Sequence, residues 1–373
     1  MPPRWFHGKR APLGQLVLDP ASATHHHSHL VSDAPSDLVS RGQAIFERLR
    51  SEPQPPVERS PVIEEDEVQD VVVPPEPIPE AAPEPVPAPE ITAEPEAAAG
   101  PEPLRDLDPA RFIRPLPRVI AITNQKGGVG KTTTAVNLGA AVADLGYRVL
   151  VVDLDPQGNA TTGLGLNTRD LQSSMYDVIL HDASIDDCIE ATSVRNLFVA
   201  PASLDLAGAE IELVPAFSRE LKLRKALEEV ADEYEYVFID CPPSLGLLTV
   251  NSLAAATEVM VPIQCEYYAL EGLGQLLRNV NLVQKNLNQA LEVSVIVCVM
   301  YDARTKLSDQ VVQEVKGHFG DKVCRTIVPR TVRLSEAPSF GQPITAFDPS
   351  SRGAIAYREL AKEITGGTPQ RTG

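Results

Sequence analysis

The sequence has few aromatic residues, no closely spaced cysteines, no long apolar run and no excess of positive charge. No stretch of about 18 apolar residues exists, so we expect no membrane-spanning helix. The first fourteen residues lack the apolar core of a secretory signal, and five dispersed cysteines without a CxxC pair indicate reduced, cytosolic thiols. A formal net charge of −18 argues against simple bulk attraction to nucleic acid, although a local basic patch remains compatible with it.

The 373 residues divide into two parts of different composition. Of 34 prolines, 23 precede Arg118, and the same stretch has 20 acidic against 10 basic residues, a net charge of −10 that leaves −8 for the remainder. From Pro53 to Pro103 the chain is acidic, proline-punctuated and almost without aromatics, so it cannot bury enough apolar area to order itself. We therefore predict a disordered tail over residues 1–117 and a folded domain over 118–373.

Two short islands interrupt this tail. Ser36–Arg50 has Leu38, Ile45 and Leu49 on one helical face, which predicts a short helix. Two interpretations remain open: a transient helix without a role, or a docking helix for a polar or division protein. The histidines of the second island, His25–His29, indicate no fixed metal geometry, so no metal site is predicted there.

A glycine-rich loop lies between a short apolar run and a helical pattern. Residues 119–124 are typical of a buried strand and residues 135–143 of a helix packed on a sheet. Glycines between them let backbone N–H groups face phosphates at a helix N-terminus, with Lys131 neutralising β/γ oxygens and the Thr132 hydroxyl ligating Mg²⁺. The predicted nucleotide-binding residues are Lys126, Gly127, Gly128, Val129, Gly130, Lys131, Thr132 and Thr133.

Three carboxylates follow predicted strands. Alternation places Asp153 and Asp155 on one face at the end of the strand 148–153, where ligands bind in open α/β sheets. We predict that Asp155 orients or deprotonates the attacking water and that Asp153 helps to hold the Mg²⁺ shell or the switch. Asp240 ends the strand 236–240 and is predicted as a further magnesium residue. Its neighbour Cys241 is interpreted as a packing residue, because nothing nearby would activate its thiol.

Further apolar runs alternate with helical patterns. Strands are expected at 197–202, 258–263 and 293–300, with another short strand ending in 324–331 and helices at 219–230 and 269–287. This alternation predicts an α/β fold, a doubly wound and mostly parallel sheet with helices on both faces.

The loop K-G-G-V-G-K-T-T, with an additional lysine at its start, resembles the deviant Walker A motif of the ParA/MinD branch of P-loop ATPases. The similarity extends over residues 118–365 and is greatest to the ParA and Soj chromosome-partitioning ATPases. It implies that Lys126 reaches the nucleotide of a second subunit and that Asp155 is needed for hydrolysis. It also implies that Pro329 and Arg330 lie near the adenine. The next residue is Thr331, where relatives usually have Asn. The resemblance further implies that Arg304 and Arg333 bind DNA without sequence specificity. The alternative interpretation of these two arginines is that they are ordinary solvated surface charges.

This resemblance implies an ATP- and Mg²⁺-dependent ATPase that segregates chromosomes in the cytoplasm, associated with the nucleoid. An ATP-bound homodimer would hold non-specific double-stranded DNA, and a ParB-like centromere-binding protein would stimulate hydrolysis and release. Two alternatives remain: a MinD-like or cargo-positioning ATPase that regulates division or polar placement, and a scaffold whose tail recruits another protein. Residues 361–373 lack a basic amphipathic helix, which disfavours membrane binding.

Overall fold

The computed structural model describes residues 110–266 and 273–369. The helix expected at 36–50, the histidines 25–29 and the rest of the acidic segment up to residue 109 lie outside these ranges. Within the described ranges no helix is long and apolar enough to cross a membrane.

A seven-stranded sheet forms the centre of the fold. Its order is β3-β4-β2-β5-β1-β6-β7, and all neighbours are parallel except the short pair β3 and β4. The predicted mostly parallel α/β sheet is therefore confirmed. The strands are β1 (Arg118–Ile122), β2 (Val149–Asp153), β3 (Glu190–Ala191), β4 (Leu197–Ala200), β5 (Tyr236–Asp240), β6 (Glu258–Gln264) and β7 (Glu292–Val299).

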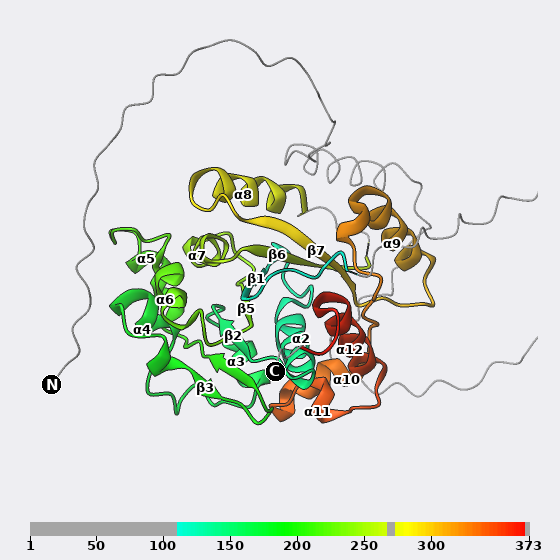
Figure 1. Cartoon of the computed structure of the whole chain (residues 1–373), viewed down its shortest axis with the longest axis horizontal. Helices are drawn as coiled ribbons and strands as arrows, with labels where there is room; N and C mark the ends of the chain where they lie inside the picture. The colour runs from blue at the N-terminus through cyan, green and yellow to red at the C-terminus, as the bar shows by residue number, and fades with distance from the viewer. Residues whose placement is uncertain (1–109, 267–272, 370–373) are drawn as a thin grey trace, which may run out of the picture. The chain divides into compact units, whose positions relative to one another are not determined.

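The central strands are apolar because both of their faces are covered. Along β2, Leu150 and Val152 point into one hydrophobic cluster, whereas Val149 and Val151 point into the other. Figure 1 shows α7 and α8 on one side of the sheet and α2 and α12 on the other. Burial on two faces removes the polar alternation of a one-sided sheet, as is usual for parallel strands.

The helices divide between these two clusters. One cluster receives residues of α4 (Met175–His181), α5 (Leu206–Glu212), α6 (Lys222–Val230), α7 (Leu247–Ala255), α8 (Leu273–Asn286) and α9 (Lys306–Phe319). The other receives residues of α2 (Lys131–Asp144), α3 (Asn159–Gly163), α10 (Val332–Glu336), α11 (Ile344–Phe347) and α12 (Arg352–Thr365). Short 3₁₀ turns lie at η1 (Asp186–Cys188), η3 (Gly320–Lys322) and η4 (Ala337–Phe340).

The packed chain begins before the domain boundary expected at Arg118. Phe112 is buried, and Arg111 donates to the Val323 carbonyl (2.9 Å) and to Glu363 (3.0 Å). Arg118 itself is buried and forms two hydrogen bonds with Glu258, of 2.7 and 2.8 Å. Residues 110–117 therefore pack on the domain, where the composition of the sequence had assigned them to the tail.

The prediction of a strand that ends in 324–331 is wrong. Only isolated parallel bridges form there, Ile296 with Val323 and Tyr301 with Pro329. The backbone N–H groups of Arg325 and Thr326 donate to the Glu363 carboxylate, at 2.7 and 2.9 Å, so they are not available for a ladder. Proline at 329 has no N–H to offer.

All five cysteines are free and buried. Burial, together with the nearby charge of Asp240, raises the pKa of the Cys241 thiol to about 12. A thiol with such a pKa is not a nucleophile at neutral pH, which supports the packing interpretation of Cys241.

Candidate functional site

The carboxyl ends of β1, β2 and β5 bring the predicted site residues to one edge of the sheet. Ile122 and Asp153 are the register partners of Asp240 on the two sides of β5. The glycine loop follows β1 directly, so it lies beside these carboxylates. In the sheet, β2, β3, β4 and β5 lie on one side of β1, whereas β6 and β7 lie on the other, so the chain changes side next to β1. Open α/β sheets bind ligands at such switch points.

The glycine loop adopts backbone conformations that residues with a side chain rarely adopt. Gly128 and Gly130 have φ values of 73° and 83°, in the left-handed region that favours glycine. A Cβ added at Gly127 or Gly128 would meet no atom within 4 Å, so the loop surrounds open space. Val129 instead points inward and is buried. Helix α2 starts at Lys131 without a side-chain cap, which leaves its first N–H groups directed at this space, a favourable position for an anion.

Lys131 lies largely inside the protein, with 6% of its surface exposed. Its ammonium donates to the Lys126 carbonyl at 3.4 Å, within the same loop. Burial lowers the pKa of Lys131, while the charges of Asp240 and Asp155 act in the opposite direction. An ammonium that is held in the loop and poorly solvated is suited to bind phosphate oxygens.

Asp240 is fully buried, and neither of its carboxylate oxygens completes a hydrogen bond with a described residue. Burial raises the pKa of Asp240 well above its usual value, and the charge of Asp153 raises it further. The Thr132 side chain and the Lys131 ammonium favour the ionised form without outweighing burial. A buried carboxylate without partners is costly unless a cation accompanies it.

The residues present fit a magnesium ion. Unpaired oxygens of Asp240 and the hydroxyl of Thr132 are hard oxygen ligands of the kind that Mg²⁺ prefers, beside a loop that suits phosphates. Within residues 110–266 and 273–369 no group of three or more His, Cys, Asp or Glu side chains is placed to hold a metal without further ligands. Mg²⁺ usually keeps several waters and binds with substrate phosphates, so a protein site with few ligands is sufficient.

Asp153 is engaged by the protein. One of its oxygens accepts from the Thr161 backbone N–H (2.8 Å) and hydroxyl (2.7 Å), and the other from the Asp155 N–H (3.2 Å). Burial raises the pKa of Asp153 to about 6, although these hydrogen bonds lower it. The Thr161 hydroxyl accepts in turn from the Ala202 N–H at 3.0 Å. Asp153 thus joins the ends of β2 and β4 to α3, and its predicted roles at the Mg²⁺ shell or the switch stay predictions.

Asp155 lies two residues farther along the chain and is also buried. One carboxylate oxygen accepts from the Gln157 N–H at 3.0 Å, which fixes the turn leading to Gly158 and α3. Asp155 influences both Lys131 and Asp240 electrostatically. The structure therefore brings the predicted catalytic carboxylate to the same place as the loop lysine.

A cavity of about 540 Å³ opens beside the glycine loop. Its lining includes Gly128, Gly130, Thr132 and Thr133 of the loop and of α2, together with Val328, Pro329, Arg330, Thr331 and Leu334. Pro329 and Arg330, predicted to lie near an adenine, face this cavity together with Thr331. The Thr331 hydroxyl accepts from the Leu334 N–H (3.3 Å) and caps α10, a position for which threonine and asparagine are both suited.

Sequence reasoning missed several residues of this cavity, among them Asn137, Gln264, Met300 and Gln342. Asn137 donates to the Thr133 carbonyl (2.7 Å) and accepts from the Ile344 N–H (2.6 Å), so it connects α2 to α11. A lone amide in the apolar stretch 135–143 was a signal for it. Nothing in the spacing indicates Gln264, Met300, Gln342 or the Asp153 partner Thr161.

Lys126 stands apart from these contacts. Its backbone N–H donates to Asn124 at 3.1 Å, and Asn124 in turn donates to the Pro262 carbonyl at 2.8 Å. The ammonium of Lys126 makes no hydrogen bond or ion pair with any residue of the described ranges. The loop therefore fixes the backbone of Lys126 and leaves its charge available.

The two predicted DNA-binding arginines are exposed but paired with acids. Arg304 forms two side-chain hydrogen bonds with Asp302, of 2.9 and 2.6 Å, and the pKa of Asp302 is strongly lowered by them. Arg333 pairs with Glu336 (3.0 Å) and Asp348 (3.4 Å). Arg304 lines a second cavity of about 620 Å³, which Arg333 does not line.

Known proteins resemble this chain over the described domain. Residues 117–293 match the model of an AAA domain family. The sporulation initiation inhibitor protein Soj of Bacillus subtilis is 60% identical over 247 residues, 66% of this chain and 98% of the relative. The chromosome partitioning protein ParA of Myxococcus xanthus is 52% identical over 258 residues, 68% and 91% of the two chains.

A solved structure is similar as well. The cobyrinic acid a,c-diamide synthase of Mycobacterium smegmatis, crystallised with ADP and magnesium, has a TM-score of 0.58 and 41% identity. The similarity covers 66% of this chain and 92% of that protein. The glycine loop, the strand-end carboxylates and the high identity over nearly the whole length of these relatives lead to one conclusion: this chain belongs to the ParA and Soj family of chromosome-partitioning P-loop ATPases.

Proposed function

We propose that this protein is an ATP-driven switch that holds and releases DNA during chromosome segregation. The observation that supports it most is the meeting of the glycine loop, Lys131 and the unpaired Asp240 at one edge of the sheet. ATP binds along the loop and in the adjoining cavity, and its base lies toward Pro329 and Arg330. Thr132 and Asp240 hold Mg²⁺, which supplies positive charge to the phosphates.

Hydrolysis needs a positioned water and stabilisation of charge on the transferred phosphoryl group. Asp155 is the residue that orients the water, because it follows β2 at the edge where Lys131 and Asp240 lie. Lys131 stabilises the charge from its own subunit. Lys126 adds a second cation from the other subunit, so hydrolysis by a single chain is slow. A ParB-like partner stimulates the reaction.

Pairing of two copies is supported by an exposed apolar face. Leu204, Ile211, Val214 and Phe217 are more than half exposed, and Phe217 reaches 92%. They lie in and around α5, whose Glu210 accepts from Ser244 in the loop that follows Asp240. An apolar face connected to the nucleotide site in this way is suited to become buried when ATP is present.

The ATP-bound pair holds DNA through Arg304 and Arg333. A pair presents each arginine twice, and the affinity for phosphates rises with every counterion released. The ion pairs of Arg304 with Asp302 and of Arg333 with Glu336 are solvent-exposed, so exchanging them for phosphates costs little. DNA association therefore depends on ATP, although one copy has a large negative charge.

The decisive experiment measures DNA binding with ATP, ADP and no nucleotide over a series of salt concentrations. A steep salt dependence seen only with ATP is expected. Arg304→Ala and Arg333→Ala should each reduce the slope by roughly two, because each substitution removes one phosphate contact from both copies of the pair. Arg195→Ala, which removes an exposed arginine before β4, is the matched control and should leave the slope unchanged. Equal binding in all three nucleotide states would refute the proposal.

The role of Lys126 is tested by Lys126→Ala. The variant should still bind ATP but remain a single copy in sedimentation with Mg²⁺ and a non-hydrolysable ATP analogue. Lys285→Ala removes an exposed lysine on α8 and should pair as the unchanged protein does. Normal pairing of the Lys126 variant would exclude a cation supplied across the interface.

A further inference from the structure

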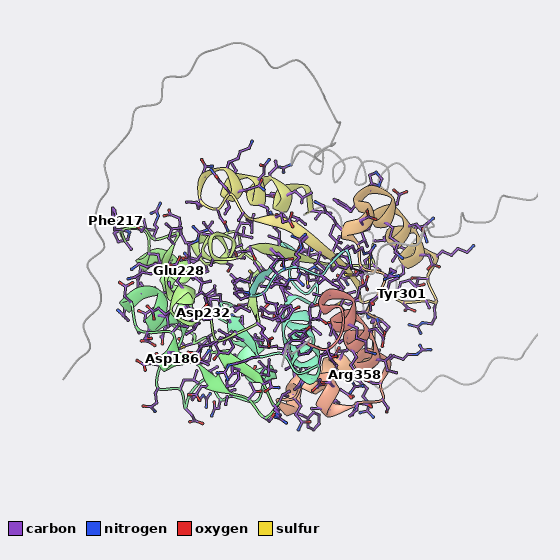
Figure 2. The ribbon with its side chains drawn as sticks, viewed as in Figure 1. Asp186, Phe217, Glu228, Asp232, Tyr301 and Arg358 are labelled. Atoms are coloured by element: carbon purple, nitrogen blue, oxygen red, sulfur yellow. The ribbon has the colours of Figure 1, made fainter. Side chains whose placement is uncertain are left out.

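A second groove lies beside the nucleotide cavity. It has a volume of about 620 Å³ and shares Pro329 and Arg330 with that cavity. Three arginines line it, Arg304, Arg330 and Arg352, so we call it the arginine groove. Its other lining includes Tyr301, Ile327, Ile355 and Ala356. Figure 2 places Tyr301 at the same side of the molecule as Arg358, which lies on α12.

The cations of the arginine groove are incompletely compensated. Arg304 is paired with Asp302, and Arg330 is 3.4 Å from Glu266. Arg352 is exposed and makes no ion pair or hydrogen bond with any residue in the described ranges. It is also the first residue of the 14-residue helix α12, whose N-terminus adds a partial positive charge.

The groove combines these cations with apolar surface. Ile355 is half exposed, and Ile327 and Ala356 are only partly buried beside it. A nucleic acid backbone would pair with the arginines but would leave this apolar surface uncovered. The arginine groove is better suited to bind an acidic peptide that also has branched apolar side chains.

This chain contains a segment of that chemistry. Residues 62–73 read V-I-E-E-D-E-V-Q-D-V-V-V, with five carboxylates, six valine or isoleucine residues and no basic residue. It is the densest run of acidic residues before Ala110. Its block of four acids, Glu64–Glu67, lies between apolar residues, and this combination complements the arginines and isoleucines of the groove.

The length of chain between the segment and the domain is sufficient. Ala110 and Ile113 lie against Glu363 and Gly366, at the C-terminal end of α12, whereas the groove lies at the N-terminal end of this helix. Fourteen helical residues span about 21 Å. A random chain of 36 residues, the number from 74 to 109, has an end-to-end distance of roughly 30–36 Å, and a proline-rich one is longer, so the linker is long enough to reach the groove.

We infer that residues 62–73 dock in the arginine groove of the same molecule and compete there with DNA. The docking itself depends only on the groove and the segment, while the competition rests on the proposed DNA binding. Tethering gives the segment an effective concentration on the order of 1 mM, enough for a weak site to be largely filled. DNA must then displace the segment, so a single copy binds DNA more weakly than its arginines alone would allow.

Docking is tested first without DNA, in the full chain. Arg352→Lys keeps the charge and supplies an amine, so a carbodiimide should join it to a carboxyl group among Glu64, Glu65, Asp66 and Glu67, as identified by mass spectrometry. Arg195→Lys is the matched control and should give no such product. Products distributed equally over both lysines, or over the acids of residues 76–102, would overturn the inference. Products found only between isotopically distinct copies would overturn docking within one molecule.

Competition is tested by removing the five charges, with Glu64, Glu65 and Glu67 changed to Gln and Asp66 and Asp70 to Asn. This variant should bind DNA about three- to tenfold more tightly at low salt. The control changes five other acids to Gln, namely Glu84, Glu90, Glu94, Glu96 and Glu102, and should stay within twofold of the unchanged chain. An equal gain in both variants means general repulsion and overturns the inference. If cross-linking succeeds while no variant binds DNA, the docking stands and the proposed DNA function fails.

Discussion

Replacing Asp240 by Asn should make the protein more stable without ligands and less responsive to nucleotide. The carboxylate is fully buried, and both of its oxygens lack hydrogen bonds within the described part of the chain. Lys131 does not compensate it directly, because its ammonium donates to the Lys126 carbonyl. Burial and the neighbouring charge of Asp153 both raise the pKa of Asp240, which shows that its negative charge is disfavoured in this environment.

The magnitude follows from the cost of an unpaired buried ion. That cost is several kcal/mol per ion, and partial protonation reduces it. Asp240→Asn removes the charge but keeps the shape, so we expect the free energy of unfolding to rise by about 1–3 kcal/mol. In a domain of this size the melting temperature rises by roughly 2–12 °C. With Mg²⁺ and an ATP analogue at 1,000 times the dissociation constant, the unchanged protein gains about 4.1 kcal/mol, which the variant should lose.

The assay is thermal unfolding followed by circular dichroism, in chelator and then with Mg²⁺ and a non-hydrolysable ATP analogue. The order of stability of the two proteins should reverse between these conditions. Asp232→Asn removes an exposed carboxylate, labelled in Figure 2, and should change stability by less than about 0.5 kcal/mol in both. If Asp240→Asn melts below the unchanged protein in chelator, the carboxylate is stabilised by the protein itself and the argument that Asp240 binds a cation is refuted.

Three further sites give measurable outcomes. Arg118→Met breaks a buried ion pair and should lower the free energy of unfolding by about 3–5 kcal/mol, measured by thermal unfolding. Lys362→Met breaks an exposed pair and should lower it by less than about 0.5 kcal/mol. Equal losses in the two variants would contradict the expected effect of burial. Burial alone would raise the pKa of Glu258, but Arg118 lowers it below the ordinary 4.5. The ion pair therefore stabilises the fold above pH 4.5, and this contribution is lost as the pH falls through the lowered pKa of Glu258. The double variant Arg118→Met with Glu258→Leu should therefore lose less stability in acid than the unchanged protein. Thr161→Val removes two hydrogen bonds and should destabilise by about 1–3 kcal/mol, whereas Thr161→Ser should not. Asp155→Ala should retain ATP and release no phosphate; normal release would remove Asp155 from its proposed role.

The sequence was sufficient for the elements whose signals are local. The apolar runs of β1, β2 and β5 are strands because both of their faces are buried, and the glycine loop between β1 and α2 requires backbone conformations that favour glycine. Asp240 was recognisable because it ends such a run. Motifs of this kind depend on residues within about ten positions of one another, so their pattern can be read directly.

Partners distant in the chain were not recognisable. Glu258 pairs with Arg118 across 140 positions, and Glu363 accepts the amides of Arg325 and Thr326 across 38 and 37 positions. The second of these contacts removes a strand that the apolar pattern had favoured. Residues 110–117 look like tail by composition and become part of the domain only because Arg111 finds partners on α12 and near β7.

By itself the sequence determined the class of fold, the phosphate loop and the family, because each of these depends on short-range pattern and on identity along the chain. The tertiary structure decided which carboxylate is left without partners. Asp153 and Asp240 end neighbouring strands in the same register, but Thr161 reaches only Asp153. Hydrogen bonding in three dimensions, and not spacing, therefore distinguishes the carboxylate that the protein itself engages from the carboxylate that we propose to hold a cation.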